Sequence, residues 1–223
     1  MPGYQTKQER VPIAGVDDLV VRSLLDNQQY SDPRGLAAAL GISSASWSLF
    51  GQVWPSGLQL ADRLARRPVR RGERILEVGC GLALASLVGH RRGADVTACD
   101  VHPLTAPFLR ANVRLNDLPP LRYRHGPWAE VARDLGAPFD LLIGSDLLYE
   151  PDEHGVLARF LTMHAAPGAE VWIVDPDRSY RAPFHRRMAT LGYERSEERV
   201  DALATGDRAA YRGRVMVYRR APG

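Results

Sequence analysis

The stretch ILEVGCGLALASL, residues 75–87, passes from an apolar strand pattern through two closely spaced glycines into a helix pattern. From Arg74 onward, short apolar runs continue to alternate with helical segments. This alternation is typical of a parallel sheet with crossover helices. We therefore expect an α/β fold with a Rossmann-like, doubly wound sheet of seven strands, which binds its ligand where the strands end.

Seven strands and four helices are predicted in this region. The strands are expected over residues 74–78, 95–99, 121–125, 139–144, 170–174, 192–198 and 214–219. The helices are expected near residues 83–92, 104–115, 152–164 and 180–191. The link between the last two strands has no strong helix pattern, so these strands are expected to pair antiparallel in a sheet that is otherwise mostly parallel.

The residues before Arg74 do not follow this alternation. Residues 1–15 are polar and contain proline and glycine, which predicts a mobile arm. Apolar positions in residues 16–27 recur at helical spacing, and residues 32–40 suggest a second short helix closed by Gly41.

The chain is therefore divided into two parts. We expect a short helical N-terminal extension over residues 1–46 and one α/β domain over residues 47–223. Near the start of the domain, Ser56 is expected to cap a helix over residues 56–67. The apolar face of the extension suits either a partial lid over the ligand crevice or a dimer contact, so the oligomeric state stays open.

Composition and charge exclude several classes of protein. The chain has 223 residues, 45% of them apolar, which suffices for one sizeable core. Its formal net charge of +3 comes with scattered arginines, so a nucleic-acid partner is not indicated. Cys80 and Cys99 lie in apolar, strand-like surroundings, which favours buried free thiols and a reducing compartment. Without a signal-peptide pattern or a run of membrane-spanning length, we expect a cytosolic protein with no membrane partner.

The glycine turn distinguishes between nucleotide cofactors. The dinucleotide pattern Gly-x-Gly-x-x-Gly would need a glycine at Leu84. The chain instead has Glu77-x-Gly79-x-Gly81, with an acid before the first glycine. The glycines let the backbone approach a ligand closely, and Glu77 can accept hydrogen bonds or offset the charge of an amino-acid moiety.

Asp100 ends the next strand and can accept hydrogen bonds from both hydroxyls of a ribose. Both NAD and S-adenosylmethionine contain such a ribose, so Asp100 alone does not distinguish them. Glu77-x-Gly79-x-Gly81 resembles the first motif of the class I methyltransferases, with Ala83 in place of the family's usual third glycine, and Asp100 on the next strand strengthens the case for a nucleoside-type cofactor. The resemblance implies S-adenosylmethionine as the cofactor, and the residues expected to bind it are Glu77, Gly79, Gly81, Asp100, Val101, Trp128 and Ser145.

The stretch GSDLLYEP, residues 144–151, places Asp146 and Tyr149 at the end of the fourth expected strand, on the edge where the ligand binds. These two residues fit the D-x-x-Y pattern of a group of class I protein lysine methyltransferases. Members that modify adenine or glutamine carry N-P-P-Y. Both prolines are absent here, which disfavours a nucleic-acid amino-methyltransferase.

Three further stretches resemble the same group, which includes the modifiers of elongation factors and of electron-transfer flavoprotein. FGQVWPSG (50–57) is similar to its W-P-x-G/A segment, and FLRANVRLN (108–116) to its helix after the second strand. VDPDRSYRAP (174–183) is similar to a segment of the flavoprotein modifiers and their bacterial relatives. The resemblance covers roughly residues 47–193 and implies a protein lysine as the methyl acceptor.

Methyl transfer to an amine requires a neutral nitrogen held in line with the methyl group. Asp146 can accept an N–H hydrogen bond and orient the nitrogen, and the proton can leave either to Asp146 or to water. Tyr149 and Trp54 can form a ring wall that favours a cationic methylated nitrogen. Asp146, Tyr149 and Trp54 are therefore the expected catalytic residues.

Several of these residues have a structural alternative. Trp54 and Trp128 can be packing tryptophans, and Asp175 and Arg178 can be a turn residue and a surface cation. The six histidines have no metal-ligand spacing, so no metal site is expected. Two rival functions stay open: methylation of a small-molecule amine or heteroaromatic nitrogen, and binding of S-adenosylmethionine without catalysis.

Overall fold

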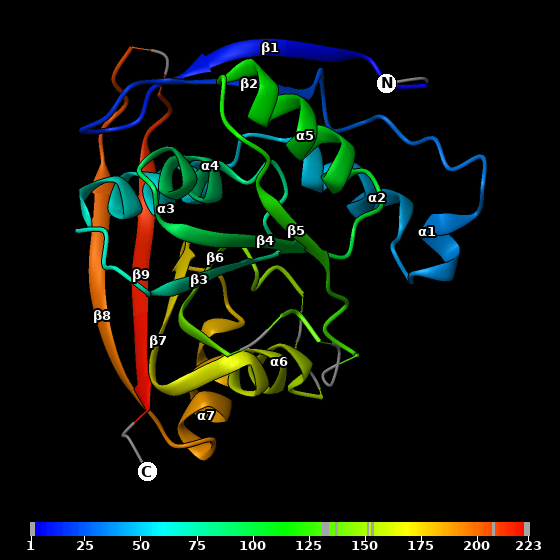
Figure 1. Cartoon of the computed structure of the whole chain (residues 1–223). Coiled ribbons are helices and arrows are strands. Elements are labelled where there is room, and N and C mark those ends of the chain that lie inside the picture. Colours follow the sequence, from blue (N-terminus) through cyan, green and yellow to red (C-terminus); the bar gives the residue numbers. More distant parts are fainter. Residues whose placement is uncertain are drawn as a thin grey trace.

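The computed structural model describes residues 3–130, 134–136, 138–150, 152, 154–206 and 208–220. Its centre is a seven-stranded sheet with the order β5-β4-β3-β6-β7-β9-β8 (Figure 1). The strands are β3 (Arg74–Val78), β4 (Asp95–Asp100), β5 (Arg122–His125), β6 (Phe139–Ser145), β7 (Ala165–Asp175), β8 (Tyr193–Ala202) and β9 (Tyr211–Arg220). All neighbours pair parallel except β9, which is antiparallel to both β7 and β8. The expected doubly wound sheet with one antiparallel C-terminal strand is confirmed.

The direction in which the sheet grows reverses beside β3. From β3 the chain proceeds outward to β4 and β5, and then returns to add β6 on the other side of β3. The carboxyl ends of β3 and β6 therefore lie at the topological switch point, where sheets of this kind form their ligand crevice.

Helices cover both faces of the sheet. In Figure 1, α3 (Pro55–Arg66), α4 (Leu84–Arg91) and α5 (Thr105–Leu115) lie on the upper face. On the lower face lie α6 (Val156–His164) and α7 (Arg181–Thr190). This arrangement explains why the central strands read as continuous apolar runs, since their side chains are buried on both faces.

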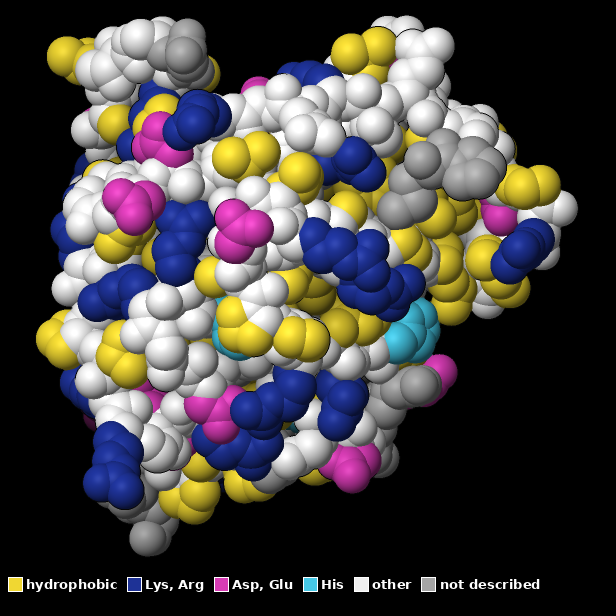
Figure 2. Space-filling view, turned by 45° about the horizontal axis from the view of Figure 1, so that its top comes forward, with side chains coloured by type: hydrophobic (Ala, Val, Ile, Leu, Met, Phe, Trp, Pro, Cys, Tyr) yellow, Lys and Arg dark blue, Asp and Glu magenta, His cyan; other side chains and the backbone are white. Residues whose placement is uncertain are grey.

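Charged side chains are dispersed over the surface. On the face drawn in Figure 2, lysine and arginine side chains form several separate groups, with acidic and apolar side chains between them. This face therefore presents no single basic patch of the kind that nucleic-acid binding needs.

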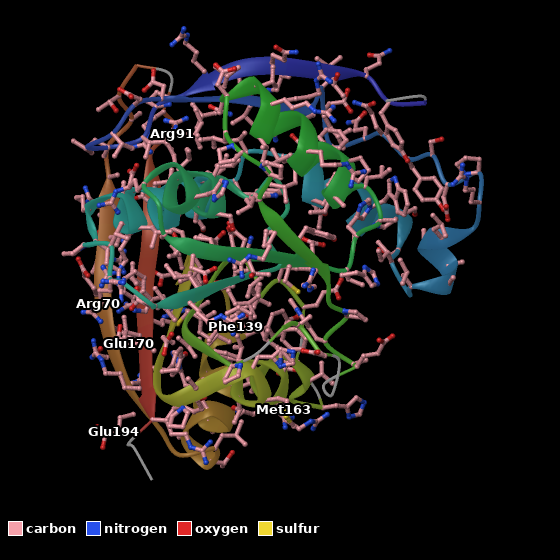
Figure 3. The ribbon with its side chains drawn as sticks, viewed as in Figure 1. Arg70, Arg91, Phe139, Met163, Glu170 and Glu194 are labelled. Carbon is pink, nitrogen blue, oxygen red and sulfur yellow. The ribbon has the colours of Figure 1, made fainter. Side chains whose placement is uncertain are left out.

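Two cores lie on opposite faces of the sheet. Ile75 belongs to the core beneath α3, α4 and α5, whereas its neighbour Leu76 belongs to the core beneath α6 and α7. Phe139, at the start of β6, is buried on the side of α6 (Figure 3). Met163 on α6 is 60% exposed, so the opposite side of that helix faces solvent.

The N-terminal part forms a β-hairpin rather than the expected helix. Strand β1 (Thr6–Val11) pairs antiparallel with β2 (Leu19–Leu24). The predicted helix over residues 16–27 is therefore wrong. The predicted mobile arm over residues 1–15 contains a paired strand, while its residues 1 and 2 lie outside the described residues.

Two asparagines on α5 explain why β2 is extended. The side-chain amide of Asn116 accepts a hydrogen bond from the Val20 N–H at 2.9 Å and donates one to the Val20 carbonyl at 2.8 Å. Asn112 does the same for Arg22, at 2.8 and 3.3 Å. These amides satisfy the free edge of β2 as a neighbouring strand would. This tertiary pairing outweighs the helical spacing of the apolar residues.

Three short elements lead from the hairpin to α3: α1 (Leu36–Ala39), α2 (Ser44–Trp47) and the 3-10 helix η1 (Ser48–Gly51). Ser56 does not cap α3 as predicted, because Trp54 occupies the N-cap position and Ser56 lies in the first turn.

Helix α6 begins at Val156, four residues after its predicted start at Asp152. The Asp152 carboxylate nevertheless accepts a hydrogen bond from the Val156 N–H at 2.7 Å. The predicted helix also included residue 153, which lies outside the described residues.

Candidate active site

The glycine turn after β3 leads directly into α4. Gly79 and Gly81 have φ angles of 59° and 52°, in the left-handed region that favours glycine. A Cβ at Gly79 would lie 2.5 Å from Leu147 Cδ2, and one at Gly81 would lie 2.9 Å from the carbonyl oxygen of Phe50. Both the backbone conformation and the close packing therefore require glycine at these positions.

Glu77 joins the end of β3 to α4. Its Oε2 accepts hydrogen bonds from the Ser86 N–H at 2.7 Å and from the Ser86 hydroxyl at 2.5 Å. Burial raises the pKa of Glu77 to about 7, the Ser86 hydrogen bonds offset part of the rise, and the charge of Asp100 adds to it. The carboxyl group is therefore close to its point of ionisation at neutral pH.

Asp100 lies at the end of β4, facing the glycine turn. Its Oδ2 accepts a hydrogen bond from the Gly81 N–H and its Oδ1 one from the His102 N–H, both at 2.8 Å. Burial raises the pKa of Asp100, and these backbone hydrogen bonds offset part of the rise. The carboxylate is fixed by amides from two loops, and each oxygen retains a lone pair for a ligand hydroxyl. Val101, the next residue, is half-buried.

Two aromatic residues at the start of the α/β domain, Trp47 and Phe50, pack on the Asp100 side of this region. The His102 ring stacks on Phe50 with a centroid distance of 3.9 Å and meets Trp47 at 4.3 Å. Burial lowers the pKa of His102 to about 3, so the ring is neutral at physiological pH. Trp47 and Phe50 therefore pack against the loop after β4.

Two further residues expected at the cofactor lie near the carboxyl ends of the strands. The Trp128 ring lies 3.7 Å from the position of a Cβ at Gly79, and the Ser145 hydroxyl lies 3.6 Å from that of a Cβ at Gly57. Trp128 therefore flanks the glycine turn, whereas Ser145 lies between the end of β6 and the start of α3.

Asp146 follows β6 with a left-handed backbone, at a φ of 57°. Its N–H donates to the Val174 carbonyl at 3.0 Å, which continues the pairing of β6 with β7. Its Oδ1 accepts a hydrogen bond from Arg178 Nη1 at 2.5 Å. Its Oδ2 is buried and has no hydrogen-bond partner among the residues that the structure describes. Asp146 is thus fixed through its backbone and one oxygen, while the second oxygen is free to accept.

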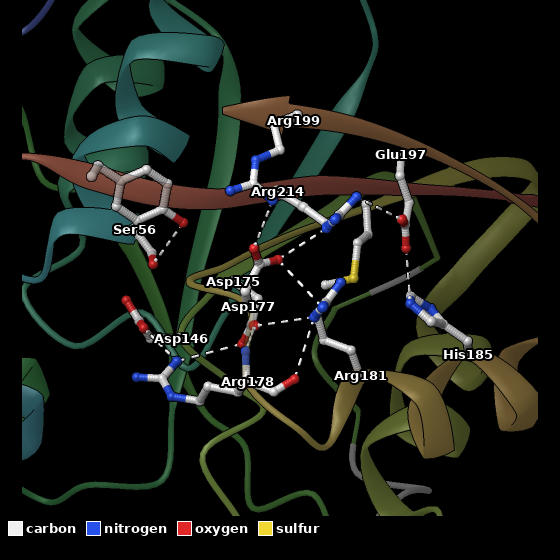
Figure 4. Close-up of polar contacts among 12 residues, drawn as sticks. Ser56, Asp146, Asp175, Asp177, Arg178, Arg181, His185, Glu197, Arg199 and Arg214 are labelled. Carbon is white, nitrogen blue, oxygen red and sulfur yellow. Dashed lines mark hydrogen bonds and ion pairs between the residues drawn. The ribbon is translucent and has the colours of Figure 1, made fainter. Parts of the chain in front are cut away.

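Arg178 also binds Asp175, the last residue of β7 (Figure 4). The Arg178 N–H donates to Asp175 Oδ1 at 2.7 Å, and its Nη1 lies 3.5 Å from Asp175 Oδ2. Desolvation raises the pKa of the buried Asp175 carboxyl, and the contacts with Arg178 offset part of the rise. Asp175 thus accepts a hydrogen bond within the turn after β7, and Arg178 is no free surface cation, because it joins the ends of β6 and β7.

The predicted ring wall consists of the side chains of Trp54 and Tyr149. The indole N–H of Trp54 donates to the Leu49 carbonyl at 2.7 Å, and its ring is half-buried. Tyr149 is 44% exposed, and partial burial together with the charge of Glu150 raises its pKa. Among the described aromatic residues no ring contact joins Trp54 to Tyr149, so the wall stays a prediction.

One buried pair near Asp146 gives no signal in the sequence. The Tyr211 hydroxyl, at the start of β9, lies 3.1 Å from the Ser56 hydroxyl. Burial raises the pKa of Tyr211 to about 12, and the charge of Asp146 contributes to the rise. The two partners are 155 positions apart, so only the folded sheet brings them together.

The described residues form neither a metal-binding group nor a membrane-spanning helix. Within the described part of the chain, no three His, Cys, Asp or Glu side chains converge as a metal-binding group. None of the helices described there combines the length and apolar character needed to cross a membrane. Cys80 and Cys99 are both free and buried.

Known sequences are similar to this chain over its central part. The profile of a family described as lysine methyltransferase matches residues 42–182, well over half of the chain. The histone-arginine methyltransferase METTL23 of Homo sapiens is 32% identical over 54% of this chain and 67% of that protein. The electron transfer flavoprotein beta subunit lysine methyltransferase of Xenopus laevis is 31% identical over 60% of this chain and 53% of that protein. The match thus spans between about half and two thirds of these relatives.

Solved structures agree on the fold. Magnesium protoporphyrin IX methyltransferase from Synechocystis PCC 6803, solved with bound SAM (S-adenosylmethionine), matches with a TM-score of 0.55. The match covers 73% of this chain and 79% of that chain, at 17% sequence identity. The expected resemblance to the class I methyltransferases is confirmed at the level of both fold and family.

Proposed function

The chain belongs to the lysine methyltransferase family, and we propose that it transfers a methyl group from S-adenosylmethionine to the side-chain amine of a lysine in a protein. The observation that carries this proposal is the geometry of Asp146. Its carboxylate lies at the end of β6, beside the glycine turn of β3, with one oxygen fixed and the other free to accept. An acceptor nitrogen bound there would lie next to a cofactor held by the turn.

The residues at the ends of β3 and β4 fit the chemical groups of S-adenosylmethionine. Asp100 offers a fixed carboxylate whose remaining lone pairs suit ribose hydroxyls. Glu77, with a pKa raised to about 7, would be driven to its ionised form by a nearby cationic group. Gly79 and Gly81 add no side chain of their own to the turn, so the backbone at these two positions can approach a ligand closely. When bound, S-adenosylmethionine would supply an electrophilic methyl group on its sulfonium.

Asp146 positions the acceptor rather than taking its proton. A free lysine has a pKa near 10.4, so its amine is protonated before it enters the site. Because Arg178 already neutralises Asp146, we assign the loss of the proton to water. Asp146 Oδ2 then accepts an N–H of the neutral amine and aims its lone pair in line with the methyl group. Tyr149 and Trp54 are proposed to flank the methylated, cationic product.

The proposal extends to the compartment and the partner of the enzyme. We place the enzyme in the cytosol, because both of its cysteines are free and buried, as in reducing compartments. We expect its partner to be a protein, in keeping with the protein substrates named for its relatives.

A lysate experiment tests the proposal. The full chain is incubated with S-adenosylmethionine tritiated at the methyl group and an extract of cells, and the label is followed on a protein gel and in the small-molecule fraction. We expect one or a few labelled protein bands that an excess of S-adenosylhomocysteine suppresses, with methyl-lysine after acid hydrolysis. Label found only in small molecules would favour methylation of a small amine instead.

A further inference from the structure

The contacts of Asp146 permit a sharper statement about the acceptor, which rests on the proposed function. We propose that Arg178 is a positioning residue that occupies one oxygen of the Asp146 carboxylate, so that the site accepts the amine of lysine and rejects the guanidinium of arginine. The choice between lysine and arginine is relevant to this chain, because one similar protein is named for methylation of arginine and another for methylation of lysine.

Arg178 is itself held in a fixed place. Its backbone N–H and its guanidinium both bind the buried carboxylate of Asp175, and the same Nη1 reaches Asp146 Oδ1. Asp175 ends β7 and Asp146 follows β6, and these two strands are neighbours with Ser145 opposite Val174. The guanidinium is therefore clamped between the ends of two adjacent strands, with 28% of its side chain exposed.

The backbone of Asp146 is equally constrained. Its φ of 57° lies in the left-handed region, which aspartate adopts more readily than most residues. The hydrogen bond from its N–H to Val174 and the ion pair to Arg178 leave Oδ2 as the one oxygen of the carboxylate without a partner among the described residues. A buried acceptor without a donor is costly, so Oδ2 is suited to a donor that the substrate brings.

The number of free oxygens selects the acceptor. A carboxylate recognises a guanidinium best through two parallel hydrogen bonds, one to each oxygen. Arg178 already uses Oδ1, so Asp146 cannot form this fork with an arginine substrate. An amine needs only one acceptor oxygen, and Oδ2 provides it.

Three variants of the full chain test the inference. Arg178→Gln removes the charge and frees Oδ1, and Arg178→Lys keeps the charge without the planar fork. Arg199→Gln is the control. The Arg199 side chain is 37% exposed and pairs with Asp177 and Asp201 at 3.1 and 3.0 Å, away from the ion pairs of Asp146. For each variant we would measure thermal unfolding, affinity for S-adenosylmethionine, kcat on labelled lysate protein, and the ratio of methyl-lysine to methyl-arginine after hydrolysis.

The expected results separate positioning from mere stability. Arg178→Gln should lower kcat by about 10- to 100-fold at unchanged cofactor affinity, because the carboxylate loses its fixed orientation. Arg178→Lys should restore part of kcat, and Arg199→Gln should keep the wild-type rate. The residual product of Arg178→Gln should contain more methyl-arginine than that of the wild type.

Several outcomes would overturn the inference. The positioning role would be removed if Arg178→Gln kept the wild-type kcat, if Arg199→Gln lost as much kcat as Arg178→Gln, or if Arg178→Lys were no better than Arg178→Gln. Methyl-arginine as the main product of the wild-type enzyme would remove the selectivity. A wild-type enzyme that labels no protein would instead overturn the proposed function and this inference with it.

Discussion

At the scale of single residues, Glu77 couples the cofactor region to pH. Its folded pKa of about 7 lies above the ordinary value of 4.5, mainly because the carboxyl is buried. A group whose pKa is raised by folding stabilises the protein most below the unfolded pKa, and this contribution is lost as the pH rises through the folded pKa. The contribution of Glu77 is therefore complete below pH 4.5 and gone above about pH 7.

Replacing Glu77 should remove this dependence. We expect Glu77→Gln to flatten the fall in the free energy of unfolding between pH 4.5 and about 7, measured by urea titration at several pH values. Affinity for S-adenosylmethionine should rise through the same range in wild type, because the ionised carboxylate suits a cationic ligand, and should stay flat in the variant. Glu194→Gln, an exposed carboxylate on β8, is the control and should follow wild type. Identical profiles for Glu77→Gln and wild type would show that Glu77 does not titrate here.

Removing the charge of Asp146 should lower turnover without changing cofactor affinity. Asp146→Asn can turn an N–H donor toward the acceptor where an oxygen is needed, so we expect kcat to fall by about 100-fold. Affinity for S-adenosylmethionine, measured by calorimetry, should stay at the wild-type value, because the contacts described for Asp146 lie at the ends of β6 and β7. An equal loss of affinity and turnover would make Asp146 a cofactor ligand instead.

At the scale of elements, the edge of β2 depends on α5. The buried Asn112 satisfies both the N–H and the carbonyl of Arg22, so Asn112→Ala leaves two backbone groups without partners. We expect the free energy of unfolding to drop by about 1–3 kcal/mol, measured by urea denaturation. Asn27→Ala, at an exposed position, should change it by less than about 0.5 kcal/mol. Similar losses in both variants would argue against strand pairing by Asn112.

The same contrast shows which elements the sequence could predict. Strands such as β3 are buried on both faces, so a short apolar run identifies them without knowledge of their neighbours. Strand β2 carries apolar residues that fit a helical spacing as well, and its state depends on amides about 90 positions away in the chain. Secondary structure that depends on such distant partners is not readable from local periodicity.

The candidate site divides in the same way. One strand-turn-helix-strand unit contains Glu77, Gly79, Gly81 and Asp100. Their spacing in the sequence therefore already predicts that they lie together at the ends of two adjacent strands. The ion pair between Asp146 and Arg178 depends on β6 and β7 being neighbours and on the rotamers of both side chains. A motif can therefore predict that Asp146 lies at the site, but not which of its oxygens remains free.

At the scale of the whole molecule, the N-terminal part is built into the main core. Val11, Leu19 and Leu24 are buried in the same core as residues of α3 and α4. On α4, Arg91 donates to the Asp17 carbonyl at 2.7 Å, which adds a polar tie between the hairpin and the domain (Figure 3). We therefore propose that residues 1–46 fold together with residues 47–223. In this arrangement they would hold Trp47 and Phe50 in place on the Asp100 side of the crevice.

A ligand bound within this single cooperative structure should stabilise all of it. At a concentration 100 times its dissociation constant, S-adenosylmethionine would add about 2.7 kcal/mol to the free energy of unfolding. For a chain of this size that corresponds to a rise in Tm of roughly 5–10 °C. NADH should give no comparable rise, because Leu84 stands where the dinucleotide pattern needs its third glycine.

Asp100→Asn should reduce the rise in Tm with S-adenosylmethionine, because it weakens the hydrogen bonds to the ribose. Asp95→Asn, at the opposite end of β4, should leave this rise unchanged. A rise with NADH and none with S-adenosylmethionine would contradict the cofactor assignment and, with it, the roles given to Glu77 and Asp100.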